Sequence, residues 1–153
     1  MTTSSRRNIV WRSALIAIAT MIPAHLAHEI ISYGVIHEKI RWSYAECVSV
    51  DCVGIFDVLI TNIISAFPVG LLFATAGAIT AQLSSHWFIL TVLWLLTLVW
   101  GLFLTAFEYR VMFALPGPDW TSSFWVNMYH PILTPLIVFS GGLVFALKFR
   151  NAI

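Results

Sequence analysis

Charged residues are scarce in this chain. Asp, Glu, Lys and Arg make up 10% of its 153 residues, and the net charge is only +1. Apolar residues make up 59%, and the mean hydropathy is +0.89. A soluble domain has about 25% charged residues, so a globule of this composition could not cover its surface with polar groups. The scarcity of charge excludes an ordinary soluble domain, a disordered chain and a nucleic-acid binder, which would need a basic face.

Charge is missing from whole stretches of the sequence. Residues 58–107 and 120–147 contain no Asp, Glu, Lys or Arg, and residues 13–36 contain only Glu29. Because about 20 apolar residues cross a bilayer as a helix, these stretches predict four spans. We expect an all-α fold, an integral membrane four-helix bundle in which residues 1–153 form a single transmembrane domain. The expected spans are about 9–34, 55–81, 87–108 and 127–147.

The few charges are distributed unevenly between the two ends of the expected spans. One side carries five cations and no acid: Arg6, Arg7, Arg12, Lys148 and Arg150. The loops 35–54 and 109–126 belong to the other side, which has three cations and six acids. The positive-inside rule then predicts that both termini are cytoplasmic and that these two loops lie outside. A bacterial inner membrane and an ER-type membrane fit this arrangement equally well.

Cysteine is also rare, and both cysteines fall in the first outer loop. Four residues separate Cys47 from Cys52. An oxidising exterior or lumen favours a disulfide between them, which would staple the short loop. A redox-active pair is less consistent with this spacing, because such pairs are typically Cys-x-x-Cys. Two thiols are too few ligands for a structural zinc ion.

The polar residues at membrane depth are the most informative. The first span contains His25, His28 and Glu29, and the spacing of four places His25 and Glu29 on one helix face. Ionisable groups in a span are costly and usually face the bundle interior or a wet cavity. We expect a buried Glu29 to be protonated or hydrogen-bonded to His25, because desolvation disfavours its charge.

The other spans bring polar residues to the same outer half. These residues are Asp57, Asn62, Glu108, Asn127, Tyr129 and His130. The inner half has nothing comparable, so we predict a polar site near the outer leaflet, drawn from all four helices. A simpler interpretation places Asp57, Glu108 and His130 in water at the membrane interface.

Small residues form a stripe along the second span, four residues apart. They are Ala66, Gly70, Ala74 and Ala78, and Asn62 extends the stripe by one turn. Small residues at this spacing let helix backbones approach closely in lipid. We therefore expect the stripe to face protein. Pro68 and Pro135 also lie within expected spans, where each removes a backbone hydrogen bond.

Three chemistries suit such a site. His25 or His28 could provide a haem or a metal with one imidazole and His130 with the other, although the expected depths of these residues match poorly. A His–Glu pair in a dry pocket could instead transfer protons to and from an apolar substrate. As a third alternative, Glu29 could act as counter-ion to a cationic amphiphile held between aromatic walls. No cofactor is predicted, with haem or metal kept as the alternative.

The residues also resemble a family of four-to-five-helix membrane proteins, the EXPERA family, which includes the sigma-2 receptor and the emopamil-binding sterol isomerase. In the first span, Ile22-Pro23 is followed by Glu29 six residues after the proline, and His25 and Glu29 together are similar to the His-x-x-x-Glu of the isomerase. Further similar positions are Asn62 before Pro68, Phe107-Glu108, Tyr129-His130-Pro131-Ile132-Leu133, and Arg41-Trp42-Ser43-Tyr44-Ala45-Glu46 with Asp51.

The resemblance implies an intramembrane pocket for a sterol-like or cationic amphiphilic ligand. By this resemblance, Glu29 would meet the ligand amine or act with His25 on a proton, while Asn62 and Glu108 would orient the ligand. The chain departs from the family pattern at Asn62, where the receptor has a Glu, so a carboxyl pair with Glu29 cannot form. Binding and isomerase-type proton transfer therefore both stay open.

A different class of function also fits a small four-helix protein with short loops. Such a chain could be a non-catalytic, accessory subunit of a larger membrane complex, or it could form a homo-oligomer. The direction in which the polar side chains point distinguishes an accessory subunit from a binding protein or an enzyme. Polar residues around an internal cavity favour binding or catalysis, whereas a tightly packed bundle with a lateral apolar groove favours a subunit. In either case the lipid bilayer is the expected surrounding, and no nucleic-acid partner is expected.

Overall fold

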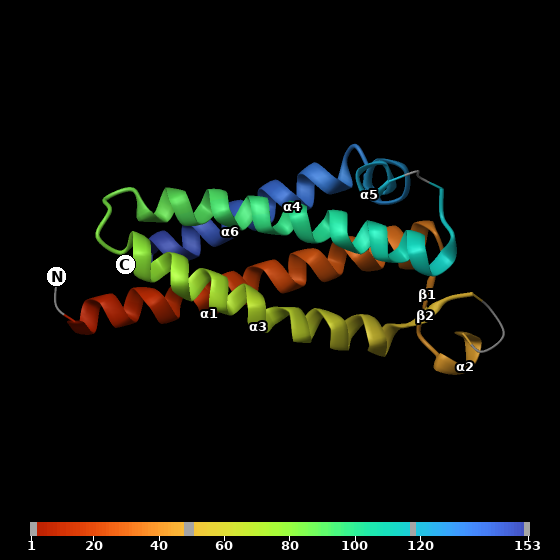
Figure 1. Ribbon diagram of the computed structural model, residues 1–153, viewed down its shortest axis with the longest axis horizontal. Helices are drawn as coiled ribbons and strands as arrows, with labels where there is room; N and C mark the ends of the chain where they lie inside the picture. Colours follow the sequence, from red (N-terminus) through yellow and green to blue (C-terminus); the bar gives the residue numbers. More distant parts are fainter. Residues whose placement is uncertain (1–2, 48–50, 117–118, 152–153) are drawn as a thin grey trace.

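The fold is a bundle of long helices, shown in Figure 1. A computed structural model describes residues 3–47, 51–116 and 119–151. Four of its helices are long and apolar enough to cross a membrane, as expected. The long helices are α1 (Thr3–Glu29), continued by the π-helix η1 (Ile30–Ile36), α3 (Ile55–Thr80), α4 (His86–Phe113) and α6 (Leu133–Asn151). The short elements are β1 (Ile40–Arg41), α2 (Tyr44–Cys47), β2 (Val53–Gly54), α5 (Trp120–Ser123) and the π-helix η2 (Phe124–Met128).

The two ends of the bundle differ in content. Helix α1 begins and α6 ends at the same end, together with the turn between α3 and α4 (Figure 1). We call this the terminal end. The opposite end, which we call the loop end, carries the described residues 37–47, 51–54, 114–116 and 119–132 with the short elements (Figure 1). Every polar residue of the predicted site lies in the half of its helix nearer the loop end, or in the loop end itself.

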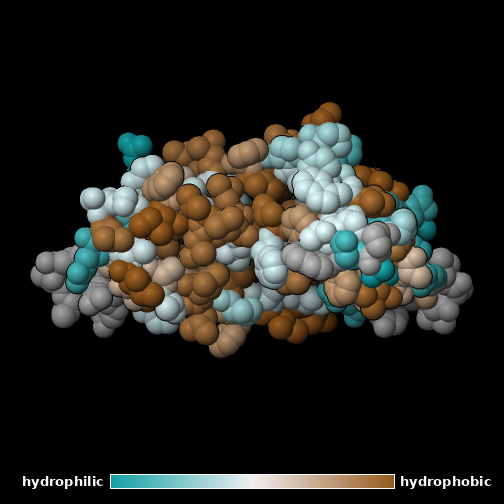
Figure 2. Space-filling model, turned by 45° about the horizontal axis from the view of Figure 1, so that its top comes forward, coloured by the Kyte–Doolittle hydropathy of each residue, from teal (hydrophilic) through white to brown (hydrophobic). Residues whose placement is uncertain are grey.

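Aromatic side chains fill the core toward the terminal end. Trp94 and Phe145 are both fully buried, and their rings stack with centroids 6.1 Å apart. Phe73 meets the edge of Phe145 at 5.7 Å, and Phe149 stacks on Phe145 at 5.8 Å. Large apolar side chains also cover the outside, such as Phe67, which is 78% exposed. Figure 2 shows hydrophobic residues over the middle of one face, with hydrophilic residues mainly toward the two ends.

Helices α1 and α3 approach closely through glycines of α3. A Cβ atom on Gly77 would collide with the Ser13 hydroxyl, and one on Gly70 would lie 2.9 Å from the Cδ1 atom of Ile18. The expected stripe of small residues therefore describes the contact only in part. Asn62 is buried, whereas Ala66, Ala74 and Ala78 are half-buried.

At the loop end, the end of α4 and the start of α6 differ from the expected spans. Helix α4 continues to Phe113 and ends where Ala114 adopts a left-handed conformation, with φ of 49°. Helix α6 begins only at Leu133, not near residue 127. A capping box at Asp119 starts the separate short helix α5. After η2 the backbone is extended at Tyr129, two residues before Pro131. Residues 127–130 therefore precede the last long helix instead of opening it.

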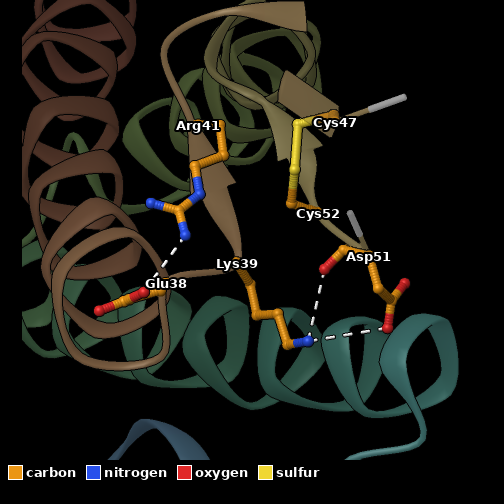
Figure 3. Close-up of a disulfide and its surroundings, with 6 residues drawn as sticks. All are labelled: Glu38, Lys39, Arg41, Cys47, Asp51 and Cys52. Carbon is orange, nitrogen blue, oxygen red and sulfur yellow. Dashed lines mark hydrogen bonds and ion pairs between the residues drawn. A yellow bond between two sulfur atoms is a disulfide. The ribbon is translucent and has the colours of Figure 1, made fainter. Parts of the chain in front are cut away.

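The first loop is closed by several independent links, which Figure 3 shows. Cys47 and Cys52 form the expected disulfide. Strands β1 and β2 pair in parallel, with Ile40 opposite Val53. Around them, Lys39 lies 3.7 Å from a carboxylate oxygen of Asp51, and Arg41 lies 3.2 Å from one of Glu38. These links join residues 39–47 to residues 51–53 at the loop end of the bundle.

Candidate functional site

Glu29 is the centre of a polar network inside the bundle. Its residue exposure is only 6%. The side-chain amide of Asn62 donates a hydrogen bond of 2.8 Å to one carboxylate oxygen, and the Tyr109 hydroxyl donates one of 3.0 Å to the other. Asn62 belongs to α3 and Tyr109 to α4, so this one carboxylate of α1 joins three helices.

His25 extends the network one turn toward the terminal end. Its Nδ1 atom lies 2.9 Å from the Asn62 side-chain oxygen, and its Nε2 atom lies 3.0 Å from the Thr105 hydroxyl. The Asn62 amide nitrogen also donates to the carbonyl of Val58 at 2.9 Å, which orients the amide. The Asn62 oxygen is thus an acceptor, and His25 must carry a proton on Nδ1.

Asn62 stands between the two residues that we expected to bond directly. The His25 Nδ1 atom is 3.8 Å from the nearer Glu29 oxygen, which is within ion-pair range but too long for a hydrogen bond. The shorter contacts of both residues are with Asn62. The expected His25–Glu29 hydrogen bond is therefore replaced by a chain of two bonds through the Asn62 amide.

A cavity of about 380 Å³ lies against this network. Helices α1, α3 and α4 line it, and its polar groups include His25, Glu29, Asn62, Thr105 and Glu108. Its remaining walls are largely apolar: Met21, Ile22, Pro68, Val69, Leu72, Leu98, Trp100 and Leu104. Pockets of roughly 300–1,000 Å³ with apolar walls and a few polar groups are typical of small-molecule sites.

The cavity opens sideways between α3 and α4. Three of its lining residues are well exposed on the outside of the bundle, namely Leu72 (41%), Trp100 (54%) and Leu104 (49%). The two helices diverge from the turn that connects them toward the loop end (Figure 1). A ligand could therefore enter from the apolar side of the bundle without passing through either loop.

A smaller cavity of about 100 Å³ lies next to the large one, nearer the loop end. Three residues line both cavities: Glu29, Thr61 and Glu108. The other lining residues of the small cavity are Val53, Asp57, Val58, Tyr109 and Met112. Of the predicted site residues, His25, Glu29, Asn62 and Glu108 thus line the large cavity, and Asp57 lines the small one.

His28 belongs to a second polar network, on the side of α1 that faces α6. It is fully buried, and its Nε2 atom lies 2.8 Å from the Thr134 hydroxyl. Its Nδ1 atom lies 3.3 Å from the Ser32 hydroxyl. Since His28 lines neither cavity, its predicted role in ligand binding has no support in the geometry.

The three candidates from the fourth span also lie away from both cavities. The ring of His130 accepts hydrogen bonds from the backbone N–H groups of Ile132 and Leu133, at the start of α6. The Asn127 amide donates to the carbonyl of Pro116 at 2.7 Å. Tyr129 packs against the Trp125 ring, with centroids 4.9 Å apart. Helix α6 begins at Leu133, six residues later than expected. These three residues therefore belong to the turn before α6 and not to the helix.

Two residues of the Glu29 network were absent from the predicted site. Tyr109 binds Glu29 and Thr105 binds His25, and both come from α4. Their spacing of four places them on one helix face, beside Glu108. That spacing is the signal in the sequence, but it is weak, because an aromatic residue at the end of a span is usually an interfacial anchor.

The histidines show little sign of a metal or haem site. The two ring nitrogens of His28 face Thr134 and Ser32, and the Nδ1 atom of His130 accepts backbone N–H groups. Within residues 3–47, 51–116 and 119–151, no group of three His, Cys, Asp or Glu side chains gathers where it could hold a metal ion. An axial pair of His25 or His28 with His130, the alternative raised by the sequence, would require these rings to give up the hydrogen bonds that they make.

Comparison with protein-family models, curated proteins and solved structures finds no match for this chain. The assignment of a function accordingly depends on the geometry of the site.

Proposed function

We propose that this chain is an integral membrane protein that binds an amphiphilic small molecule in the cavity between α1, α3 and α4. Both termini would lie in the cytoplasm and the loop end outside, following the distribution of Lys and Arg. One observation carries the proposal. The cavity has largely apolar walls, and its two acidic residues, Glu29 and Glu108, lie in the halves of α1 and α4 nearer the loop end.

The charges around the cavity favour a ligand with a cationic head. Glu29 and Glu108 line the cavity, whereas no Lys or Arg among the described residues does. A cation beside Glu29 would compensate a carboxylate that is otherwise 6% exposed and whose nearest basic partner, within the part of the chain that the structure describes, is His25. The apolar body of the ligand would lie along Val69, Leu72 and Leu98. A rigid sterol-like amine has this combination, and such a ligand is consistent with the proposed membership of the EXPERA family.

The same residues are suited to moving a proton. His25 and Glu29 both line the cavity, and the Asn62 amide connects them by two hydrogen bonds. A His–Glu pair shielded from water can protonate and deprotonate an apolar substrate. We include isomerase-type proton transfer in the proposal. It predicts that a recovered unsaturated sterol gains deuterium from D₂O when the protein is wild type, but not with Glu29→Gln.

The cavity also bears on the alternative of an accessory subunit. A subunit that only fills space in a larger complex has no need of an internal cavity with a buried carboxylate. The polar residues of α1, α3 and α4 converge on one cavity of about 380 Å³, which opens sideways between α3 and α4. This convergence favours ligand binding, whether the chain acts alone, as a homo-oligomer or within a larger complex.

The test uses a matched pair of ligands in lipid nanodiscs, a radiolabelled 3β-amino sterol and the corresponding 3β-hydroxy sterol. Glu29→Gln should weaken binding of the amino sterol on the order of 10–100-fold, because it removes one partner of a buried charge pair. Binding of the hydroxy sterol should change much less. Untargeted lipid mass spectrometry of the purified chain would identify the natural ligand.

Glu38→Gln is the matched control, because it makes the same chemical change at an exposed site in the first loop. It should leave the binding of both sterols unchanged. Equal loss of both sterols in Glu29→Gln would contradict the cationic head. Full retention of both would contradict the site itself.

A further inference from the structure

The small cavity is placed to connect Glu29 with the water at the loop end. Glu29, Thr61 and Glu108 form the boundary that it shares with the large cavity. At its other end it is lined by Asp57 and Met112, which are both exposed. Asp57 lies in the first turn of α3, and Met112 lies in the last turn of α4. The cavity therefore runs from the ends of two helices to the buried carboxylate.

The ionisable side chains that line this passage are acidic. Asp57 and Glu108 line it together with Glu29, and among the described residues no Lys or Arg does. In the part of the chain that the structure describes, the carboxylates of Asp57 and Glu108 make no hydrogen bond or ion pair. Clefts lined by one sign of charge concentrate ions of the opposite sign.

We propose that the small cavity is a water-filled vestibule through which protons reach Glu29 from the loop end. The ligand site then has two entrances. The apolar ligand enters between α3 and α4, and protons and water enter past Asp57 and Met112. The inference deepens the proposed function, because it assigns the source of the proton that the Glu29 site would hold or transfer. The evidence for the vestibule is independent of the ligand, because it consists of the two cavities and the acidic residues that line them.

The test measures which charged molecules can reach Thr61, the uncharged residue that lines both cavities. The native cysteines form a disulfide, so Thr61→Cys provides a single free thiol. The variant is reconstituted in phosphatidylcholine vesicles and treated with two thiosulfonate reagents of similar size, one with a trimethylammonium group and one with a sulfonate. Neither partitions into lipid, so neither can use the opening between α3 and α4. Mass spectrometry follows the modification of residue 61.

We expect the cationic reagent to modify Thr61→Cys on the order of tenfold faster than the anionic one, after normalisation to a free thiol in solution. Adding Asp57→Asn and Glu108→Gln should bring this ratio close to one. Adding Met112→Trp, which places a bulky ring at the entrance, should slow both reagents at least several-fold. Ser65→Cys, which lines only the large cavity, repeats the test at greater depth in case the first variant does not fold.

Ile64→Cys is the control on the same helix. Ile64 is 67% exposed on the outside of α3 and lines neither cavity, so lipid should protect it from both reagents. The vestibule is refuted if Thr61→Cys reacts no faster than Ile64→Cys, or if the normalised rates of cation and anion are equal. It is also refuted if Met112→Trp leaves the rates unchanged. These readouts need no ligand, so the sterol test can fail independently of this one.

Discussion

The Asn62 side-chain amide donates a hydrogen bond of 2.8 Å to the Glu29 carboxylate, linking α3 to α1 at the polar end of the cavity. Its second N–H group bonds the Val58 carbonyl, and its oxygen accepts from His25. The nitrogen and the oxygen of this amide are thus both hydrogen-bonded. A carboxylate at position 62 would instead place a second acid directly against Glu29.

Replacing Asn62 with leucine tests how much this amide contributes to the fold. Asn62→Leu should lower the free energy of unfolding by about 1–3 kcal/mol, because Glu29 and His25 would lose a buried hydrogen-bond partner. Chemical unfolding in detergent micelles, followed by circular dichroism, measures the change. Thr75→Val is the control, since the Thr75 hydroxyl bonds only within its own helix at an exposed position. Equal losses in the two variants would contradict a special role for Asn62.

The stacked tyrosines give a second, internally matched test. The rings of Tyr33 and Tyr109 lie 3.8 Å apart and almost parallel, but only Tyr109 bonds Glu29. The Tyr33 hydroxyl is buried and has no hydrogen-bond partner within the described residues. Tyr109→Phe should therefore cost about 1 kcal/mol of unfolding free energy, whereas Tyr33→Phe should be neutral or stabilising. The reverse order in thermal unfolding would show that the Glu29 bond is not the stabilising one.

The contact between α1 and α3 predicts the effect of a single methyl group. Gly77→Ala would drive a Cβ atom into the Ser13 hydroxyl and disturb its 2.8 Å bond to the Phe73 carbonyl. We expect a loss of about 1–3 kcal/mol, measured by thermal unfolding in detergent. Gly34→Ala is the matched control, because its Cβ would meet only Ile40 and Ile30, at 3.6 Å or more. A smaller loss for Gly77→Ala than for Gly34→Ala would place the close helix contact elsewhere.

The turn that begins α5 should depend on pH. Hydrogen bonds from the Ser122 backbone, and then from the Thr121 hydroxyl, lower the pKa of Asp119 below its usual value. The bonds stabilise the turn fully above the pKa of the unfolded state, about 3.9, and this stabilisation is lost as the pH falls through the lower pKa of the folded state. Amide hydrogen exchange at Thr121 and Ser122, corrected for the intrinsic pH dependence, should become faster over that range.

Asp119→Asn checks the origin of this pH dependence. Asparagine can still cap the helix, but it does not titrate. The corrected exchange rates of the variant should therefore stay flat with pH. A transition that persists in the variant would have to come from another group.

Several features of the site follow from local patterns in the sequence. Glu29 is the only charged residue in an otherwise apolar span, and burial of such a group demands partners. The spacing of His25 and Glu29 places them on one face, and both line the cavity. Asn62 was expected to face protein from the spacing of small residues, and it is buried.

Other features depend on how the helices are rotated and where they break. His25 and His28 are three residues apart on the same helix, yet one faces α3 and α4 while the other faces α6. Sequence spacing cannot separate them, because both directions are interior to a bundle. The break at residues 129–132 is also not revealed by a count of charged residues, since the residues on both sides are uncharged.

The sequence by itself predicts the four long apolar helices, because stretches of this length with so little charge satisfy their backbone hydrogen bonds within a helix. It also singles out Glu29 as the exception. The tertiary structure alone decides that Asn62 and Tyr109 meet Glu29, and that the polar groups of three helices border a single cavity. The physical reason is packing: the rotation of each helix selects which side chains can meet, and the close approach of α1 and α3 at Gly70 and Gly77 is one of the contacts that fix it.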